Sequence, residues 1–195
     1  MSESYIQLPP DGTGKRVRAI YLPGLGSYEE VQASKPIEYE NPVYAVSVSA
    51  SAVAASKHHL TLWNGSTRYL RILAAILSMH TTGTVTGYNM QYIMQRAGAV
   101  SGGTPLTIAK LDPRDPDPPA GLSAVTGATV TLIEAPLAVF ALNPEDSGSN
   151  SLVYFLPPKP IVLVPNTGIT IQQYSTAGVG LFNATLFFAT EVIVP

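Results

Sequence analysis

The chain has 195 residues, of which 46% are hydrophobic and only 12% are charged, and its net charge is −2. This length suits one domain, or one domain with an arm, and a near-neutral charge gives no signal of a nucleic-acid partner. The complete absence of cysteine excludes disulfide bonds, thiol catalysis and cysteine-ligated zinc. Because the charged content is about half the usual ~25%, we expect other subunits to cover much of the surface.

Residues 1–42 are predicted to form a hairpin followed by an extended arm. Two short strands, 4–8 and 15–22, flank a Pro-Pro-Asp-Gly turn signal. Residues 28–42 are polar, with four Glu and two Pro, which is typical of a segment that becomes ordered on a neighbouring molecule. The first twelve residues lack the basic and apolar regions of a secretory signal, and no apolar run reaches the ~18 residues that span a bilayer.

Residues 43–195 are predicted to form one all-β domain. Short runs of branched and aromatic residues alternate with Gly, Pro and Asn turns, a pattern typical of a β-sandwich, jelly roll or barrel. We expect a single sandwich or jelly-roll-like domain. The expected strands are 43–53, 58–63, 69–79, 85–96, 106–110, two within 126–142, 152–156, 161–164, 169–174 and 181–194.

The segment 69–79 is the difficult one. Its Leu, Ala and Met residues favour a helix by intrinsic propensity, and both of its period-two faces are largely apolar, so periodicity does not decide. A strand that is covered on both sides fits equally well. We predict a strand, because turn and strand sequences flank the segment.

The segment 85–96 alternates well, except at Ile93, and places Tyr88 and Tyr92 on one face. Two tyrosines on one strand face can form a platform for a sugar ring or a nucleobase. Packing in the core or at a subunit interface is the simpler interpretation, and we prefer it. Gly98, Gly102 and Gly103 are expected to end this strand.

Charges are segregated along the chain. Residues 41–111 carry five basic and no acidic side chains, whereas residues 112–195 carry seven acidic and two basic ones. One interpretation is a chance distribution on a solvated surface. The other is that the basic face of one subunit meets the acidic face of a neighbour. The candidate interface residues are then Arg68, Arg71, Tyr88, Tyr92, Asp112, Asp115 and Asp117.

No metal site is predicted. His58 and His59 are adjacent, and adjacent strand residues face opposite sides, so they do not readily share one ion with His80. The carboxylates of Asp112, Asp115 and Asp117 lie in a proline-rich loop that we expect to be stiff, extended and solvated. Their spacing is not that of a calcium-binding EF-hand loop.

No catalytic motif is found either. The Gly-Thr-Gly-Lys run at residues 12–15 is followed by a predicted strand, whereas a phosphate-binding loop precedes a helix. The sequence contains no nucleophile elbow and no defensible Ser/His/acid set. We therefore expect a non-enzymatic protein without a cofactor.

Four phrases of the sequence resemble virion structural proteins of tailed bacteriophages. The resemblance implies a β-rich, oligomeric particle component, and it supplies no catalytic residues. The phrases are LPPDGTGKRVRAIYL at 8–22, HHLTLWNGSTRYLRILAAIL at 58–77, QRAGAVSGGTPLTIAKLDPRDPDPPAG at 95–121 and IVLVPNTGITIQQ at 161–173.

Within that group, the chain looks most like an accessory capsid decoration, or cement, protein. Such a protein is made in the host cytoplasm and binds the major capsid protein on the outside of the head. We expect it to self-associate, as a homotrimer, with neither nucleic acid nor membrane as partner. The alternative is a tail, collar or fibre component that binds a receptor or glycan through loops 112–119 or 143–150. Copy number per particle distinguishes the two.

Overall fold

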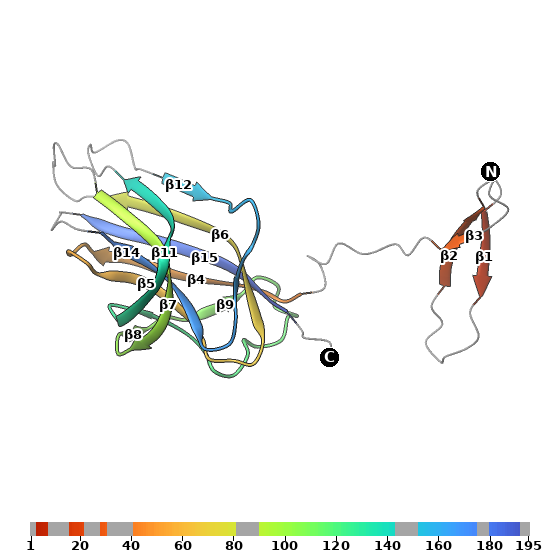
Figure 1. Ribbon diagram of the computed structural model, residues 1–195, viewed down its shortest axis with the longest axis horizontal. Helices are drawn as coiled ribbons and strands as arrows, with labels where there is room; N and C mark the ends of the chain where they lie inside the picture. Colours follow the sequence, from red (N-terminus) through yellow and green to blue (C-terminus); the bar gives the residue numbers. More distant parts are fainter. Residues whose placement is uncertain are drawn as a thin grey trace. The chain divides into compact units, whose positions relative to one another are not determined.

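The computed structural model describes residues 3–7, 16–21, 28–30, 41–80, 90–142, 152–174 and 180–191. Every regular element in these ranges is a β-strand, and the strands of residues 41–191 form two antiparallel sheets packed against each other (Figure 1). The predicted all-β sandwich is therefore confirmed. The chain divides into two compact units, Met1–Glu40 and Asn41–Pro195, a boundary two residues from the predicted one.

The N-terminal unit is a small antiparallel sheet in the order β1-β2-β3. The predicted hairpin is present as β1 (Glu3–Gln7) and β2 (Arg16–Tyr21). The expected arm begins differently, because Tyr28–Glu30 forms β3 and pairs with β2. The polar composition predicted an extended segment without strand pairing. Tyr28, a residue with high β propensity, pairs through its main chain instead. Residues 31–40, the rest of the predicted arm, lie outside the described residues.

The sandwich consists of a β7 sheet and a β6 sheet, which we name after their longest well-paired strands. The β7 sheet has the order β11 (Thr129–Leu142), β7 (Met90–Ser101), β14 (Thr167–Gln173), β5 (His58–Asn64), β10 (Leu122–Thr126) and β8 (Thr104–Pro105). The β6 sheet has the order β12 (Leu152–Phe155), β6 (Tyr69–His80), β15 (Leu181–Glu191), β4 (Val43–Ala52) and β9 (Ile108–Lys110), and β13 (Ile161–Leu163) also pairs with β6.

The core lies between the two sheets and follows from period-two alternation. On β15, Phe182, Ala184, Leu186 and Phe188 are buried, and the alternate residues between them are partly exposed. The Phe182 ring stacks on Tyr92 of the β7 sheet, with ring centroids 4.3 Å apart. Aromatic stacking of this kind adds to the area that the rings remove from water. The largest core side chains thus hold the two sheets together.

The strand predicted at 69–79 is confirmed. β6 pairs with β15 along eleven residues and with β12 and β13 on its other side. It is therefore a central strand of its sheet. Leu70, Ile72 and Leu77 face the core, and the partly exposed outer face also carries apolar residues such as Ile76, so the strand shows no clear amphipathic period. Context has overridden the helix propensity of Leu, Ala and Met.

Three boundaries differ from the sequence prediction. Gly98 does not end β7, which continues to Ser101 because residues 99–101 pair with β11, and the Ile133 side chain lies over the glycine. The predicted pair of strands in 126–142 is one strand, β11, whose pairing with β7 shifts register between Ile133 and Ala138. The strand β10 is absent from the sequence prediction. Its short sequence alternates only weakly, so pairing with β5 defines it.

Candidate interaction surfaces and buried polar groups

The three aspartates of the proline-rich loop each contact a different partner. Asp112 binds the Arg114 side chain at 2.7 Å, and this ion pair lowers the pKa of Asp112 to about 2. Asp115 Oδ2 accepts a hydrogen bond from the Val43 amide at 3.1 Å, and Asp117 pairs with a lysine. Each carboxylate thus has its own partner, and the described residues contain no group of three or more potential ligands.

The same loop is more compact than predicted. The Asp115 amide donates to the Asp112 carbonyl at 3.0 Å, which closes a turn. The Tyr44 hydroxyl donates to the Pro116 carbonyl at 3.1 Å. The prolines predict an extended loop, but hydrogen bonds to β4 fold it against the sandwich. The loop therefore fixes the start of β4, where the chain enters the sandwich.

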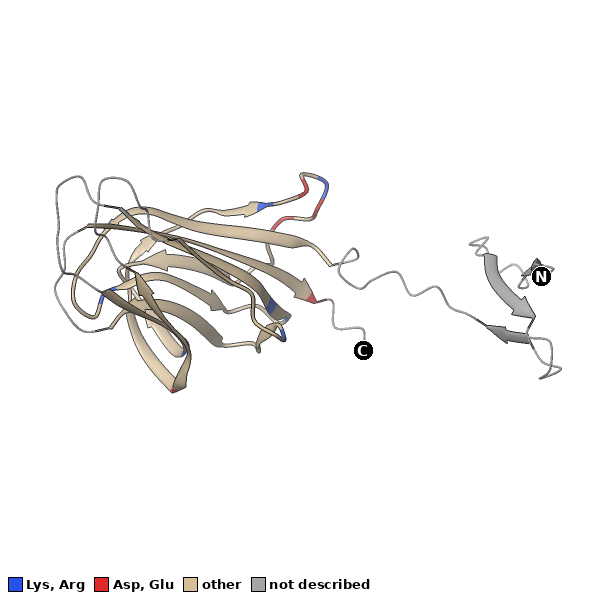
Figure 2. Ribbon diagram, turned by 90° about the horizontal axis from the view of Figure 1, so that it is seen from above, with Lys and Arg blue, Asp and Glu red and all other residues tan. Residues whose placement is uncertain are grey.

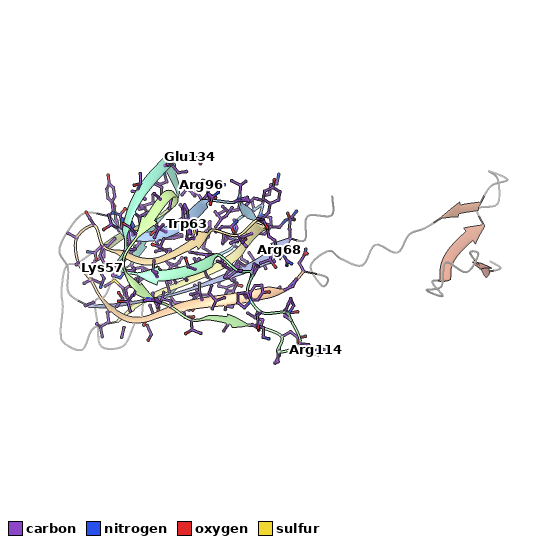
Figure 3. All side chains as sticks on the ribbon, turned by 90° about the horizontal axis from the view of Figure 1, so that it is seen from below. Lys57, Trp63, Arg68, Arg96, Arg114 and Glu134 are labelled. Carbon is purple, nitrogen blue, oxygen red and sulfur yellow. The ribbon has the colours of Figure 1, made fainter. Side chains whose placement is uncertain are left out.

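The charge segregation in the sequence results from pairing within the chain. Arg71 pairs with Glu191, Arg96 Nε lies 3.1 Å from Glu134 Oε2, and Lys110 Nζ lies 3.1 Å from Asp117 Oδ1. Strand pairing and loop packing bring early basic residues next to late acidic ones. Figure 3 shows Arg96 and Glu134 side by side. The predicted exchange of charge between subunits is therefore not needed to explain these three cations.

Arg68 has no ion pair with another residue of the described ranges, whereas Arg71 has its partner in the same chain. Figure 2 shows that charged residues gather at strand ends and turns, and that most of the strand surface carries none. Of the two predicted interface arginines, only Arg68 therefore keeps a free charge in the described part of the chain.

Tyr92 is a core residue. Its side chain is fully buried, and its hydroxyl donates to Met79 Sδ at 3.3 Å. Burial raises the pKa of this phenol. Its ring is thus unavailable for stacking on a sugar or a base. It packs in the core, so its inclusion among the candidate interface residues is wrong. Tyr88, its predicted neighbour on the strand face, lies outside the described residues.

The two histidines of β5 belong to two separate polar clusters. His58 Nδ1 lies 3.0 Å from Thr170 Oγ1, which in turn lies 2.8 Å from Thr61 Oγ1. His59 Nδ1 lies 2.9 Å from Ser51 Oγ, and its ring sits against those of Tyr92 and Phe182. The two imidazoles thus contact residues of different strands and do not meet each other. The His80 side chain lies outside the described residues.

The Ser51–His59 pair resembles a nucleophile and its base only in outline. Both side chains are buried, so a substrate would have no access to the serine hydroxyl. Burial, together with the positive charge of Lys57, lowers the pKa of His59 to about 4. A histidine with this pKa is a weak base at neutral pH. The described contacts of the pair include no carboxylate, and we interpret it as a polar contact that holds the core.

The outer surface of the β6 sheet is almost uncharged. Register places Ser47, Thr185, Ile76 and Tyr154 in one row across four strands, and Ala45 with Phe187 in the next. The Arg71–Glu191 pair lies at one end. We call the remaining residues the β6 face: Val43, Ala45, Ser47, Leu73, Ile76, Ser78, Leu152, Tyr154, Asn183, Thr185 and Phe187.

One lateral side of the sandwich exposes large apolar side chains. β11 ends the β7 sheet and β12 ends the β6 sheet, and Phe140 meets Phe155 edge-on across the gap at 5.4 Å. On these strands Val139 is 61% exposed and Leu152 is 67% exposed. We call residues 137–142 and 152–156 the open edge. The opposite side of both sheets ends in short strands, β8 with two residues and β9 with three.

The sequence did not identify the β6 face or the open edge. The runs LAVFAL and LVYFL predict ordinary strands, because an apolar strand at a sheet edge has the same composition as one in the centre. Only the pairing shows that β11 and β12 each have one strand neighbour within the described ranges. The low overall charge was the one available signal.

Comparisons with known proteins give no further assignment. No protein-family model matches the chain, and no curated protein or solved structure is similar to it. In the ranges that the structure describes, no helix is long and apolar enough to cross a membrane.

Proposed function

We propose that this chain is a non-enzymatic structural protein that binds other protein subunits through the β6 face. In the finer form of the proposal it is an accessory decoration, or cement, protein on the outside of a bacteriophage head, with the major capsid protein as its partner. The observation that carries the proposal is the β6 face itself, which spans four paired strands and is free of charge apart from one ion pair at its end.

Such a face suits binding by buried area. A stable interface buries roughly 800 Å² on each partner, and the core of an interface is depleted of charged residues. Removing a charge from water is costly unless it is paired, so a face without free charges loses little when another protein covers it. Phe187 lies in the middle of the face beside Ala45, which leaves a large apolar side chain ready to be covered.

The finer form of the proposal depends on the resemblance to tailed-phage virion proteins. Two of the resembling phrases, 58–77 and 161–173, contain β5, β6, β13 and β14. These strands form the framework of both sheets, so the resemblance concerns the scaffold more than a binding site. A cement protein needs a stable scaffold with a large contact surface and many copies, because multivalency multiplies weak contacts.

The first test is the number of copies in purified particles, measured by quantitative mass spectrometry against the major capsid protein. A ratio near one, or a simple fraction of one, supports a place on the capsid lattice. A ratio of a few per cent would contradict decoration and support the alternative, a tail, collar or fibre component.

The second test concerns the β6 face. We expect Thr185→Lys to weaken binding to undecorated particles by about tenfold or more, because a lysine charge would be buried there (about 1.4 kcal/mol per factor of ten). Ser123→Lys is the matched control, since Ser123 is exposed on β10 of the other sheet. Unfolding curves establish that both variants fold. Normal decoration by the Thr185→Lys variant would refute binding through this face.

A further inference from the structure

The open edge lacks the features that keep sheet edges from pairing with other chains. Monomeric proteins protect edge strands with short length, charges, prolines or bulges. The β8 and β9 side is protected by its short strands. β11, in contrast, has fourteen residues, and only β7 pairs with it among the described strands.

Protection on β11 stops at Pro136. Glu134, which has a positive φ of 61°, lies at the register shift of β11, and its carboxylate pairs with Arg96. Arg96 also donates from Nη1 to the Val162 carbonyl at 2.7 Å, and this hydrogen bond links β7 to β13 of the other sheet. Beyond Pro136 the sequence LAVFAL contains no charge, no Pro and no Gly. A segment of this composition on an exposed edge is prone to pair with another strand.

The segment is complementary to itself. Antiparallel pairing of two copies about a two-fold axis at Val139 places Val139 opposite its own counterpart. Leu137 of one copy then lies opposite Ala141 of the other, and Phe140 opposite Ala138, so that each large residue meets a small one. Without a charge in the segment, the two copies meet no repulsion. The exposed Leu137, Val139 and Ala141 lie on one face of the extended sheet.

The position of β12 also favours a second copy of the chain as the partner. β12 lies across from β11 and exposes Leu152 and Tyr154, and Leu156 follows it. Because a two-fold axis perpendicular to the sheet keeps each layer on its own side, the two β12 strands approach when the two β11 strands pair. This contact covers apolar side chains that pairing of β11 alone leaves in water.

We propose that two copies of this chain pair edge to edge, with residues 137–141 of one copy antiparallel to residues 137–141 of the other. The pairing joins two sandwiches into one continuous two-layered assembly. It predicts a dimer, or a larger assembly with an even number of copies, and thereby differs from the trimer that the phage resemblance implies. The proposal is independent of the β6 face, because its tests use the purified chain without particles.

The first experiment measures the mass of the purified full-length chain by sedimentation at micromolar concentrations. We expect a dimer, and we expect Val139→Lys to convert it to a monomer, because the two-fold axis brings the two new lysines together. Leu111→Lys is the matched control. Leu111 is also an exposed apolar residue, but it follows β9 on the protected side, so this variant should stay dimeric.

The second experiment tests the register and uses the absence of cysteine in the natural chain. Val139→Cys should form a disulfide-linked dimer under mild oxidation, because directly opposite residues have Cβ atoms about 4.5–5.5 Å apart. Leu111→Cys should stay uncrosslinked. Leu137→Cys and Ala141→Cys should crosslink to each other when mixed, in preference to each with itself.

The outcomes separate the alternatives. A wild-type monomer, or a trimer whose Val139→Cys variant does not crosslink, would overturn the proposal. So would a dimer that survives Val139→Lys. If the chain is monomeric and Val139→Lys abolishes particle binding, another protein covers the open edge. A dimer that binds no particle would refute the proposed decoration function and leave this inference intact.

Discussion

The two lateral sides of the sandwich are built on opposite principles. On the β8 and β9 side, strands of two and three residues leave little backbone to pair with another chain, and the exposed charges of Lys110 and Asp117 lie beside them. On the β11 and β12 side, an uncharged apolar edge lies in the open next to a packed aromatic pair. The β8 and β9 side is thus protected against pairing with another strand, whereas the β11 and β12 side is not. Local packing and electrostatics should therefore contribute differently on the two sides.

The largest effect is expected from core packing near the open edge. Phe140→Ala should lower the free energy of unfolding by about 3–5 kcal/mol, because it removes a nearly buried ring that contacts Phe155. Ile108→Ala on the β9 side should cost about half as much, since Ile108 is only partly buried. Both are measured by urea unfolding in a Val139→Lys background, which we expect to prevent the proposed dimer. Equal costs on the two sides would contradict the comparison.

Acid should weaken both sides together, because His59 lies in the core between the two sheets. Its folded pKa of about 4 is below its unfolded value of 6.5, so the unfolded state binds a proton first. The stabilisation is complete above pH 6.5 and is lost as the pH falls from 6.5 towards 4.

We expect a loss of about 2 kcal/mol between pH 6.5 and pH 4.5 from this group. The measurement compares urea unfolding of the natural chain with that of His59→Phe, which cannot titrate at this position. The variant should lose clearly less stability in acid. If both chains show the same slope against pH, the assignment to His59 is wrong.

The ion pairs of the two sides should give the smallest effects. Arg96→Ala removes both the Glu134 contact and the hydrogen bond to Val162, and should cost about 1–3 kcal/mol. Lys110→Ala removes an exposed pair with Asp117 and should cost less than about 1 kcal/mol. Thermal unfolding at two salt concentrations separates them, because salt screens the exposed pair more strongly. A larger loss for Lys110→Ala would reverse the assigned roles.

The sequence predicted the class of fold because its turn residues and its alternation are strong local signals. It also predicted β6 correctly, where flanking sequence outweighed helix propensity. It did not predict that Ile133 packs over Gly98, because that contact joins residues thirty-five positions apart. The continuity of β11 through Pro136 was missed for the same reason, since pairing with β7 on both sides of the register shift defines it.

The interaction surfaces were less accessible to sequence reasoning than the fold. The Arg71–Glu191 and Arg96–Glu134 pairs form only when distant segments meet, so segregated charges in the sequence gave no sign of them. Asp112, Asp115 and Asp117 lie in the loop that the sequence predicted, but the partners of Asp115 and Asp117 depend on β4 and β9. The low charged content predicted that other subunits cover much of the surface, but it did not identify which strands form the covered surface.

The entry and exit of the sandwich lie next to each other. The Thr190 amide donates to the Pro42 carbonyl at 3.1 Å, and Ala189 pairs with Val43. A unit whose ends meet can be placed inside a surface loop of another protein, or its ends can be joined and new ones opened elsewhere, with little disturbance of its core. The sandwich is therefore a portable module that could display a foreign sequence at a loop of choice.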